Sequence, residues 1–332
     1  MHTNFWKELK QKPIFSLAPM EDVTDTSFRQ LVLEISDPEK LDVLYTEFTN
    51  VDGLLHDVGR KSVRERLIVS TEERRLLKEK NVKLVAQIWG SDPEKFYQAA
   101  KLISKEYDFD GIDINMGCPA KKVVKNYCCS SLILVPEIAK DIVQATKEAT
   151  LLPVSVKTRT GFTEVETESW ISHLMQTHPA AIILHGRTRK MMSKYPADWN
   201  EIKKAVDIKN SINPDVAFLG NGDVTSYADG ISKINQSGVD GIMVGRGIFA
   251  NPWFFNPDKS DISAEEKINT LWRHTQLFTQ NWDTRRNFNV LKRFYKIYAQ
   301  GFPGAASLRA QLMECQSAAD VKVIVNKIVS TI

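Results

Sequence analysis

The sequence predicts a (β/α)8 barrel, an α/β fold of the TIM-barrel type, followed by a small domain made only of helices. Eight short apolar runs recur within about 240 residues, and helical patterns separate them. Apolar runs that alternate with helices are typical of a parallel sheet covered by helices, because both faces of such strands are buried. Eight consecutive units favour a closed barrel over an open doubly wound sheet.

Each predicted strand is a short apolar run bounded by turn or helix signals. In chain order these strands span residues 14–19, 43–48, 84–89, 111–116, 154–159, 181–186, 217–222 and 241–246. The clearest helices between them cover residues 92–107, 135–150 and 227–238, where apolar residues recur at helical spacing.

The pattern changes after the eighth strand. Residues 251–261 have the composition of a loop, and residues 262–332 show helical periodicity without a strand signal, interrupted at residues 301–304. We therefore assign residues 1–255 to a catalytic barrel and residues 256–332 to a helical domain.

Composition excludes several classes of protein. The 332 residues are 42% hydrophobic and 26% charged, which is typical of globular chains and not of disordered, collagen-like or coiled-coil chains. No apolar run approaches the roughly 18 residues of a membrane span, and residues 1–15 lack the apolar core of a signal peptide. We expect a cytoplasmic, monomeric protein without a membrane partner.

The four cysteines do not form a disulfide scaffold in a chain of this length, and no CxxC pair is present. We therefore expect no metal site.

Positive charge gathers in the last quarter of the chain. Residues 258–332 carry 11 Lys or Arg against 7 Asp or Glu, and no acidic residue lies between Asp283 and Glu314. Aromatic residues are interleaved with the cations of this stretch, among them Phe288, Phe294, Tyr295, Tyr298 and Phe302. Such a stretch can bind phosphates and stack on bases, or it can be an ordinary amphipathic helix with a solvated basic face.

Polar residues end almost every predicted strand. In a (β/α)8 barrel the functional groups lie at these carboxyl ends and in the loops that follow. The predicted strands deliver to one mouth Met20, Glu47, Gln87, Asn115, Cys118, Lys157, Arg159, His185, Arg187, Asn221, Asp223, Gly245 and Arg246.

The seventh and eighth strands end in glycine-containing segments, GNGD at 220–223 and GRG at 245–247. Small residues there let backbone N–H groups approach a phosphate, although glycines can also simply form tight turns. Gln87, Lys157 and His185 could hydrogen-bond a planar heterocycle, and a lysine beside a flavin would stabilise the negative charge of the reduced ring.

Cys118 lies in the segment NMGCPAKK, directly after the fourth strand. The following Lys121 and Lys122 favour an acidic thiol, whereas the alternative is a buried, inert cysteine. We interpret Cys128 and Cys129, which open the next helical segment, as packing residues.

Taken together, these segments resemble the tRNA-dihydrouridine synthases over nearly the whole chain. The resemblance rests on LAPMEDVTDTSFR (17–29), YTEF (45–48), AQIWG (86–90), DINMGCPAKKV (113–123), VSVKTRTGF (154–162), HGRTR (185–189), GNGDV (220–224), GIMVGRGIFANPWFF (241–255) and LKRFYKIYAQGFPGAASLR (291–309).

The resemblance implies an FMN site, with NADPH as the electron donor and tRNA as the substrate. It assigns the flavin site to Ala18, Pro19, Met20, Gln87, Lys157, His185, Asn221, Gly222, Asp223, Gly245 and Arg246. It makes Asn115 the residue that orients the uracil and Cys118 the general acid. It places the substrate tRNA near Arg159, Arg187, Lys121, Lys292, Arg293 and Lys296.

The implied reaction reduces the C5–C6 bond of uridine, with hydride passing from flavin N5 to C6 and a proton from Cys118 to C5. NADPH would reduce the flavin in a separate half-reaction. The target uridine has to be flipped out of its stack, and phosphate contacts of the basic helical domain would offset that cost.

The sequence departs from the family pattern at three places. Residues 126–131, NYCCSS, replace a glycine-rich run, Asp22 replaces a glycine, and residues 190–196 are unusual. Three alternatives stay open: an FMN barrel reductase acting on a small molecule, an RNA-binding protein with an inactive barrel, and a flavin-free aldolase that uses Lys157 as a Schiff-base lysine.

Overall fold

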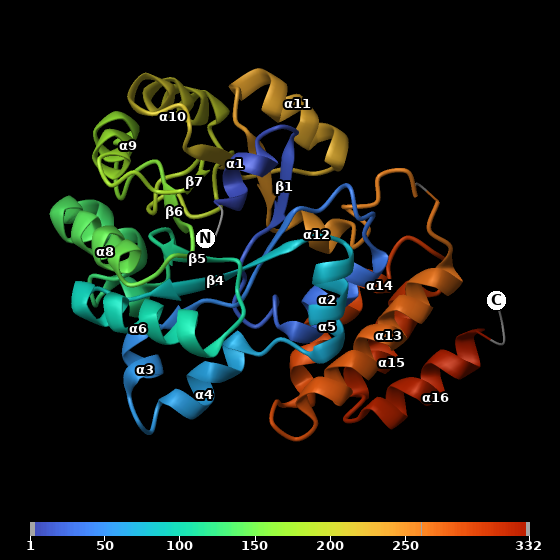
Figure 1. The fold of residues 1–332 in the computed structure, drawn as a ribbon. Coiled ribbons are helices and arrows are strands. Elements are labelled where there is room, and N and C mark those ends of the chain that lie inside the picture. Colours follow the sequence, from blue (N-terminus) through green and yellow to red (C-terminus); the bar gives the residue numbers. More distant parts are fainter. Residues whose placement is uncertain (1–3, 260, 330–332) are drawn as a thin grey trace.

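The computed structural model describes residues 4–259 and 261–329. Within these residues, nine parallel strands form one sheet that closes into a barrel (Figure 1). The strands follow one another in chain order, and pairing of β2 with β4 completes the circle. Their bounds are β1 Ile14–Leu17, β2 Val43–Tyr45, β3 Thr49–Asn50, β4 Lys83–Trp89, β5 Gly111–Asn115, β6 Val154–Arg159, β7 Ala181–His185, β8 Ala217–Asn221 and β9 Gly241–Val244.

The eight predicted strands are all present, so the predicted barrel is confirmed. The additional strand β3 was not predicted. It pairs through Thr49 and Asn50 with the end of β4, and a two-residue pairing has no periodicity that a sequence could reveal.

Buried side chains fill the barrel from inside. One cluster contains strand residues such as Val43, Tyr45 and Ile183, together with Phe5 and Trp6 of the first helix. This helix, α1 (Phe5–Leu9), therefore closes the end of the barrel at which the strands begin, and the opposite end stays open as a mouth.

Helices cover the outside of the barrel, and polar caps define where many of them begin. The carboxylate of Asp92, directly before Pro93, accepts the N–H groups of Glu94 and Lys95 at the start of α6, and the Ser226 hydroxyl caps α11. The helices of the barrel are α1 Phe5–Leu9, α2 Thr26–Ile35, α3 Val51–Leu55, α4 Arg60–Arg64, α5 Thr71–Glu79, α6 Pro93–Glu106, α7 Lys121–Val124, α8 Pro136–Glu148, α9 Thr167–Met175, α10 Trp199–Ile212, α11 Tyr227–Ser237 and α12 Gly247–Ala250, with the short 3-10 helices η1 Glu65–Leu67 and η2 Cys129–Leu134.

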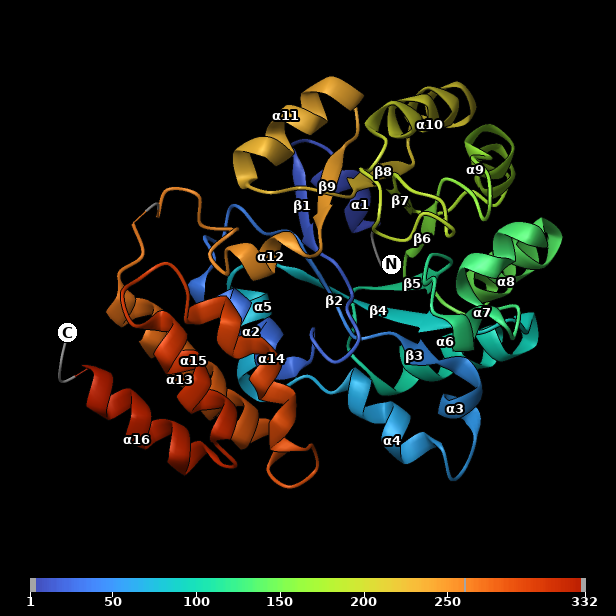
Figure 2. The same ribbon diagram turned by 180° about the vertical axis from the view of Figure 1, so that it is seen from behind.

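The described residues from α13 onward are mainly helical, as predicted. It consists of α13 Ala264–Trp282, η3 Phe288–Leu291, α14 Lys292–Tyr298, α15 Ala305–Glu314 and α16 Ala318–Val329. In both views α13 lies beside α2 (Figures 1 and 2). Trp282 Nε1 donates to Asp25 Oδ2 at 2.6 Å, and Arg273 Nη2 lies 2.7 Å from Glu34 Oε1.

One continuous apolar core joins the outer layer of the barrel to these helices, so the two regions pack as a unit. No helix in the described part of the chain is both long and apolar enough to cross a membrane.

Candidate active site

A cavity of about 660 Å³ opens at the mouth of the barrel. It lies where β1, β6, β7, β8 and β9 end, which is where this fold places its chemistry. Its lining includes most of the residues that the sequence assigned to a flavin, and two assigned to RNA: Ala18, Pro19, Met20, Lys157, Arg159, His185, Arg187, Asn221, Gly222, Asp223, Gly245 and Arg246.

The glycine-containing loops after β8 and β9 form one wall of this cavity. Gly222 has a φ of 128°, a conformation that residues with a side chain rarely adopt, and a Cβ there would lie 2.6 Å from Ala197 Cβ. A Cβ on Gly245 would meet only Ala18 Cβ, at 3.9 Å, so this backbone faces open space. Arg246 is exposed beside it, with Nη2 3.3 Å from Asp223 Oδ1.

Three basic side chains, Lys157, Arg159 and His185, also line the cavity. Lys157 Nζ donates to Asn221 Oδ1 at 3.3 Å, and Arg159 Nε donates to the carbonyl oxygen of Gly117 at 2.6 Å. Burial and the charge of Arg159 lower the pKa of Lys157 to about 8, and burial holds the pKa of His185 well below its usual range. No carboxylate of the described residues forms an ion pair with Lys157, and the more distant charges of Asp113 and Cys118 offset its burial only in part.

Gln87 and Asn115 lie below the cavity and bond to each other. Gln87 Nε2 donates to Asp113 Oδ2 at 2.6 Å, and Asn115 Nδ2 donates to Gln87 Oε1 at 2.9 Å. Asn115 Oδ1 accepts the N–H groups of Gly117 and Cys118, at 3.1 and 2.9 Å. Asn115 therefore positions the loop of Cys118. The predicted contacts of Gln87 with a flavin and of Asn115 with a base stay predictions.

Asp113 was not among the predicted site residues. It is fully buried in β5, where it accepts from Ser155 Oγ as well as from Gln87, and burial raises its pKa to about 6. The signal in the sequence was a single acidic residue inside the apolar run GIDIN. Its carboxylate fixes the amide of Gln87 and so the whole row of side chains up to Cys118.

Cys118 is partly exposed just beyond β5. A hydrogen bond from Cys129 lowers its pKa to about 6; burial opposes this shift, and the N–H of Ala120 and the charge of Arg159 add to it. The predicted acidic thiol therefore has a structural basis, although Cys129 and Arg159 supply it rather than the neighbouring lysines.

The predicted basic patch lies on α14 and borders the mouth. Arg293 and Lys296 are exposed and Lys292 is half-buried, and Arg293 Nη1 donates to the carbonyl oxygen of Asp22, in the loop after β1. Lys121 is exposed at the start of α7.

The aromatic residues of this stretch have another role. Phe294, Tyr295 and Tyr298 are at most 3% exposed, so the interpretation of these rings as a base-stacking platform is wrong. Arg286 is also engaged: it lies 3.9 Å from the ring centroid of Trp282 and binds Glu47 at 2.8 Å. These residues attach α13 and α14 to the rim of the barrel.

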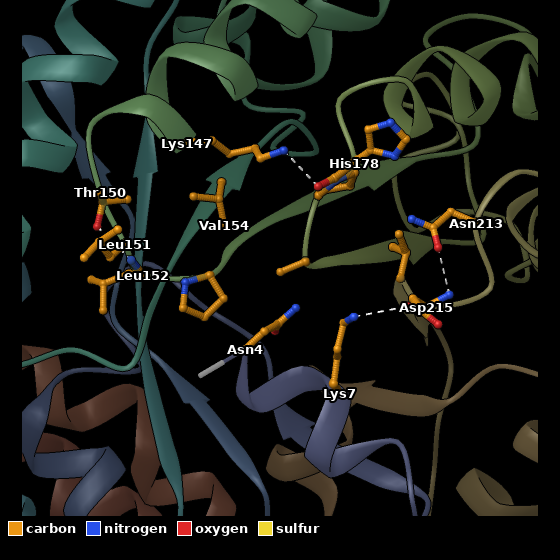
Figure 3. A pocket seen from close by; sticks show the side chains of 14 residues that line it. Asn4, Lys7, Lys147, Thr150, Leu151, Leu152, Val154, His178, Asn213 and Asp215 are labelled. Atoms are coloured by element: carbon orange, nitrogen blue, oxygen red, sulfur yellow. Dashed lines mark hydrogen bonds and ion pairs between the residues drawn. The ribbon is translucent and has the colours of Figure 1, made fainter. Parts of the chain in front are cut away.

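A second cavity, of about 290 Å³, lies at the closed end of the barrel (Figure 3). The two lysines that line this cavity already bind groups of the protein itself. Lys7 pairs with Asp215 at 3.1 Å, and Lys147 Nζ donates to the carbonyl oxygens of Thr177 and His178. The mouth is therefore the stronger candidate for a functional site.

Solved structures support the fold. Histamine dehydrogenase from Rhizobium sp. 4-9 superimposes with a TM-score of 0.51 at 14% identity, covering 79% of this chain and 48% of that one. A morphinone reductase variant in complex with tetrahydroNAD gives a TM-score of 0.51 at 12% identity, covering 74% and 85%. At such low identity the likeness concerns the barrel alone.

Proteins related by sequence have a much higher identity to this chain. A protein described as a probable tRNA-dihydrouridine synthase from Staphylococcus aureus (strain COL) is 42% identical over 329 residues, covering 98% of this chain and 96% of its own. Probable tRNA-dihydrouridine synthase 2 from Bacillus subtilis (strain 168) is 41% identical, covering 98% and 97%. The family described as dihydrouridine synthase (Dus) matches residues 16–332, and the chain belongs to this family of oxidoreductases.

Proposed function

We propose that the protein is an FMN-dependent tRNA-dihydrouridine synthase, which uses NADPH to reduce the C5–C6 bond of particular uridines in tRNA. The observation that carries the proposal is the mouth cavity, in which a buried lysine without a carboxylate ion pair among the described residues lies near a partly exposed, acidic thiol. The names of the relatives from S. aureus and B. subtilis support the substrate.

The residues of the mouth fit FMN. A cavity of about 660 Å³ is of the size that ligand sites of this kind have. The open backbone at Gly245 and the guanidinium of Arg246 suit a phosphate, and Lys157 and His185 suit the polar edge of a flavin ring. Bound FMN would supply the hydride for the reduction.

Lys157 has the charge that this chemistry requires. Within the described part of the chain no carboxylate forms an ion pair with its ammonium, so an electron-rich group bound in the cavity would regain free energy that its burial costs. His185, held neutral, offers a hydrogen bond without adding a further positive charge.

Cys118 is the proposed acid, which gives the proton to C5 of the uracil. Cys129 and the charge of Arg159 lower the pKa of its thiol, and the charge of Glu21 raises it. Because its pKa is about 6, the protonated fraction falls as the pH rises above that value. The row Asp113–Gln87–Asn115 positions this acid by holding the backbone of its loop.

The helices after residue 255 are the proposed tRNA-binding region. Lys292, Arg293 and Lys296 extend the positive charge of the mouth along α14, and Lys121 lies on the cysteine side of the rim. Phosphate contacts there would offset the few kcal/mol that flipping the target uridine out of its stack requires.

The test uses tRNA from a host that lacks all dihydrouridine synthases. The purified protein and NADPH are added, the tRNA is digested, and dihydrouridine is mapped by mass spectrometry. Dihydrouridine at a defined position is expected. If none forms while the yellow protein reduces orotate or a small enone, the protein is a small-molecule reductase. A colourless protein that does not bind FMN contradicts the flavin assignment.

A further inference from the structure

Two thiols meet at the mouth of the barrel, and the proposed reaction uses only one of them. Cys129 opens η2 and is 0% exposed, and its thiol hydrogen-bonds the sulfur of Cys118. The N–H and the hydroxyl of Ser130 both donate to the carbonyl oxygen of Cys118, at 3.4 and 2.8 Å. The segment after α7 is thus fastened alongside Cys118, which keeps the two sulfurs together.

The neighbouring cysteine is directed elsewhere. Cys128 Sγ donates to the carbonyl oxygen of Asn126 at 3.3 Å, and it also bonds the Ser91 side chain. Cys128 and Cys129 are therefore equivalent in the sequence but different in the structure, and Cys128 provides a matched control.

The surroundings of the two sulfurs divide their roles. Cys118 is partly exposed, and the charge of Arg159 and the N–H of Ala120 favour its thiolate, which is the nucleophilic form. Cys129 is enclosed and stays protonated, because burial and the neighbouring sulfur raise its pKa. A partly exposed thiolate beside a buried thiol is the arrangement of an attacking and a resolving cysteine.

We propose that Cys118 and Cys129 form a site of reversible oxidation by hydroperoxides. The Cys118 thiolate attacks hydrogen peroxide, the O–O bond breaks, and a sulfenic acid and hydroxide form. The Cys129 sulfur then displaces the sulfenic oxygen, its thiol proton leaves with that oxygen as water, and a Cys118–Cys129 disulfide results. Two thiols are oxidised by two electrons as one peroxide is reduced to two waters, and a dithiol reductant reverses the modification.

The proposal goes beyond the proposed function and is tested without an activity assay. The flavin-loaded protein is treated with hydrogen peroxide, free thiols are blocked, and tryptic peptides are analysed by mass spectrometry. Lys121, Lys122 and Lys125 separate the peptide of Cys118 from the peptide that carries Cys128 and Cys129. We expect the two peptides to become linked, the four free thiols of the chain to fall to two, and dithiothreitol to restore all four.

Matched variants identify the partner sulfur. Cys128→Ser should still form the link, whereas Cys129→Ser and Cys129→Ala should lose it and accumulate sulfinic acid on Cys118 that dithiothreitol does not reverse. Bound flavin and an unchanged melting temperature show that each variant is folded. A link that survives in Cys129→Ser, or irreversible oxidation of Cys118 in the unchanged protein with Cys129 still a free thiol, overturns the proposal. Failure to make dihydrouridine leaves this result unaffected.

Discussion

The two ends of the barrel use similar residues in opposite ways. At the closed end, Asp42, Asp110 and Asp240 each stand directly before a strand, and their carboxylates accept N–H groups of the neighbouring strand. The donors, each at 2.8 Å, belong to Phe15, Leu84 and Phe218. Lysines neutralise some of these carboxylates, as Lys12 does for Asp42 at 2.9 Å. The charged side chains at this end therefore hold neighbouring strands together.

At the mouth, Asp223 pairs with Arg246, but the buried Lys157 has no carboxylate ion pair among the described residues. Lys157 and His185 bind protons less readily than the same side chains do in water, because they are buried among cations. Such an arrangement costs stability and is maintained where a ligand or a reaction needs it. The difference indicates that the closed end stabilises the fold while the mouth performs the chemistry.

The largest expected effect on the reaction rate comes from replacing Cys118, the proposed acid. Cys118→Ala should keep the bound flavin and reduce the rate of dihydrouridine formation by about 10²- to 10⁴-fold, because the proton donor is gone. Flavin absorbance and the turnover of tRNA by the variant check both parts. Loss of flavin, or a rate near that of the unchanged protein, would show that Cys118 has another role.

The same acid predicts a dependence on pH. Only the protonated thiol can donate, so the rate of base reduction should fall about tenfold per pH unit above the pKa of about 6. Cys129→Ala removes the hydrogen bond that lowers this pKa, so the fall should move to higher pH. Single-turnover rates measured from pH 5 to about 9 with both proteins provide the comparison. Identical profiles would exclude the influence of Cys129.

Lys157→Met should weaken the binding of FMN while it stabilises the flavin-free protein. Affinity for FMN should fall about tenfold, which corresponds to about 1.4 kcal/mol, because the charge facing the flavin is lost. The flavin-free protein should gain about 1 kcal/mol at pH 7, since a poorly compensated cation is removed. A lysine with a lowered pKa destabilises the fold below about pH 8 and no longer does so above about 10.5, so the gain should vanish as the pH rises through this window. FMN titration and denaturant unfolding test these expectations, and a destabilised variant would contradict them.

A smaller effect is expected from the basic surface of α14. Replacing Lys292, Arg293 and Lys296 by alanine should weaken tRNA binding and lower the slope of log affinity against log salt by up to about 2 to 3. Oxidation of NADPH should not change. Lys203→Ala with Lys204→Ala, on the far side of the barrel, is the matched control. If both sets of variants shift the slope equally, the surface of α14 is not the RNA interface.

A substitution at the closed end should change the free energy of unfolding but not the activity. Asp110→Ala leaves the N–H of Leu84 without its carboxylate and should reduce the free energy of unfolding by about 1 to 3 kcal/mol. Turnover per folded molecule should stay the same. A changed KM for tRNA or a loss of flavin would break the division between the two ends.

Apolar runs that alternate with helical patterns predicted the barrel almost completely, because strands buried on both faces are continuous apolar segments. The positions of Lys157, His185, Asn221 and Gly245 around one cavity followed from the rule that such strands end at the same mouth. Contacts between side chains of different strands could not be predicted in this way, and the row Asp113–Gln87–Asn115 is an example.

The loop after α7 is a second region in which the sequence did not predict the side-chain contacts. Tyr127 and Cys129 both have a φ of 55°, and Asp22 has a φ of 56°, in the left-handed region that favours glycine. The structure thus accounts for the glycines that the family pattern has in these two loops. The sequence showed the departure but not the contact between Cys118 and Cys129 that accompanies it.

The most direct test of the account is the oxidation of the reduced flavin by tRNA. The protein is reduced with NADPH without oxygen, excess NADPH is removed, and flavin absorbance is followed after mixing with tRNA. With tRNA from a strain lacking dihydrouridine synthases, we predict rapid oxidation by the unchanged protein and by Asp110→Ala, and at least about 100-fold slower oxidation by Cys118→Ala. Equal rates with tRNA that already contains dihydrouridine, or oxidation by small enones but not by tRNA, would contradict the account.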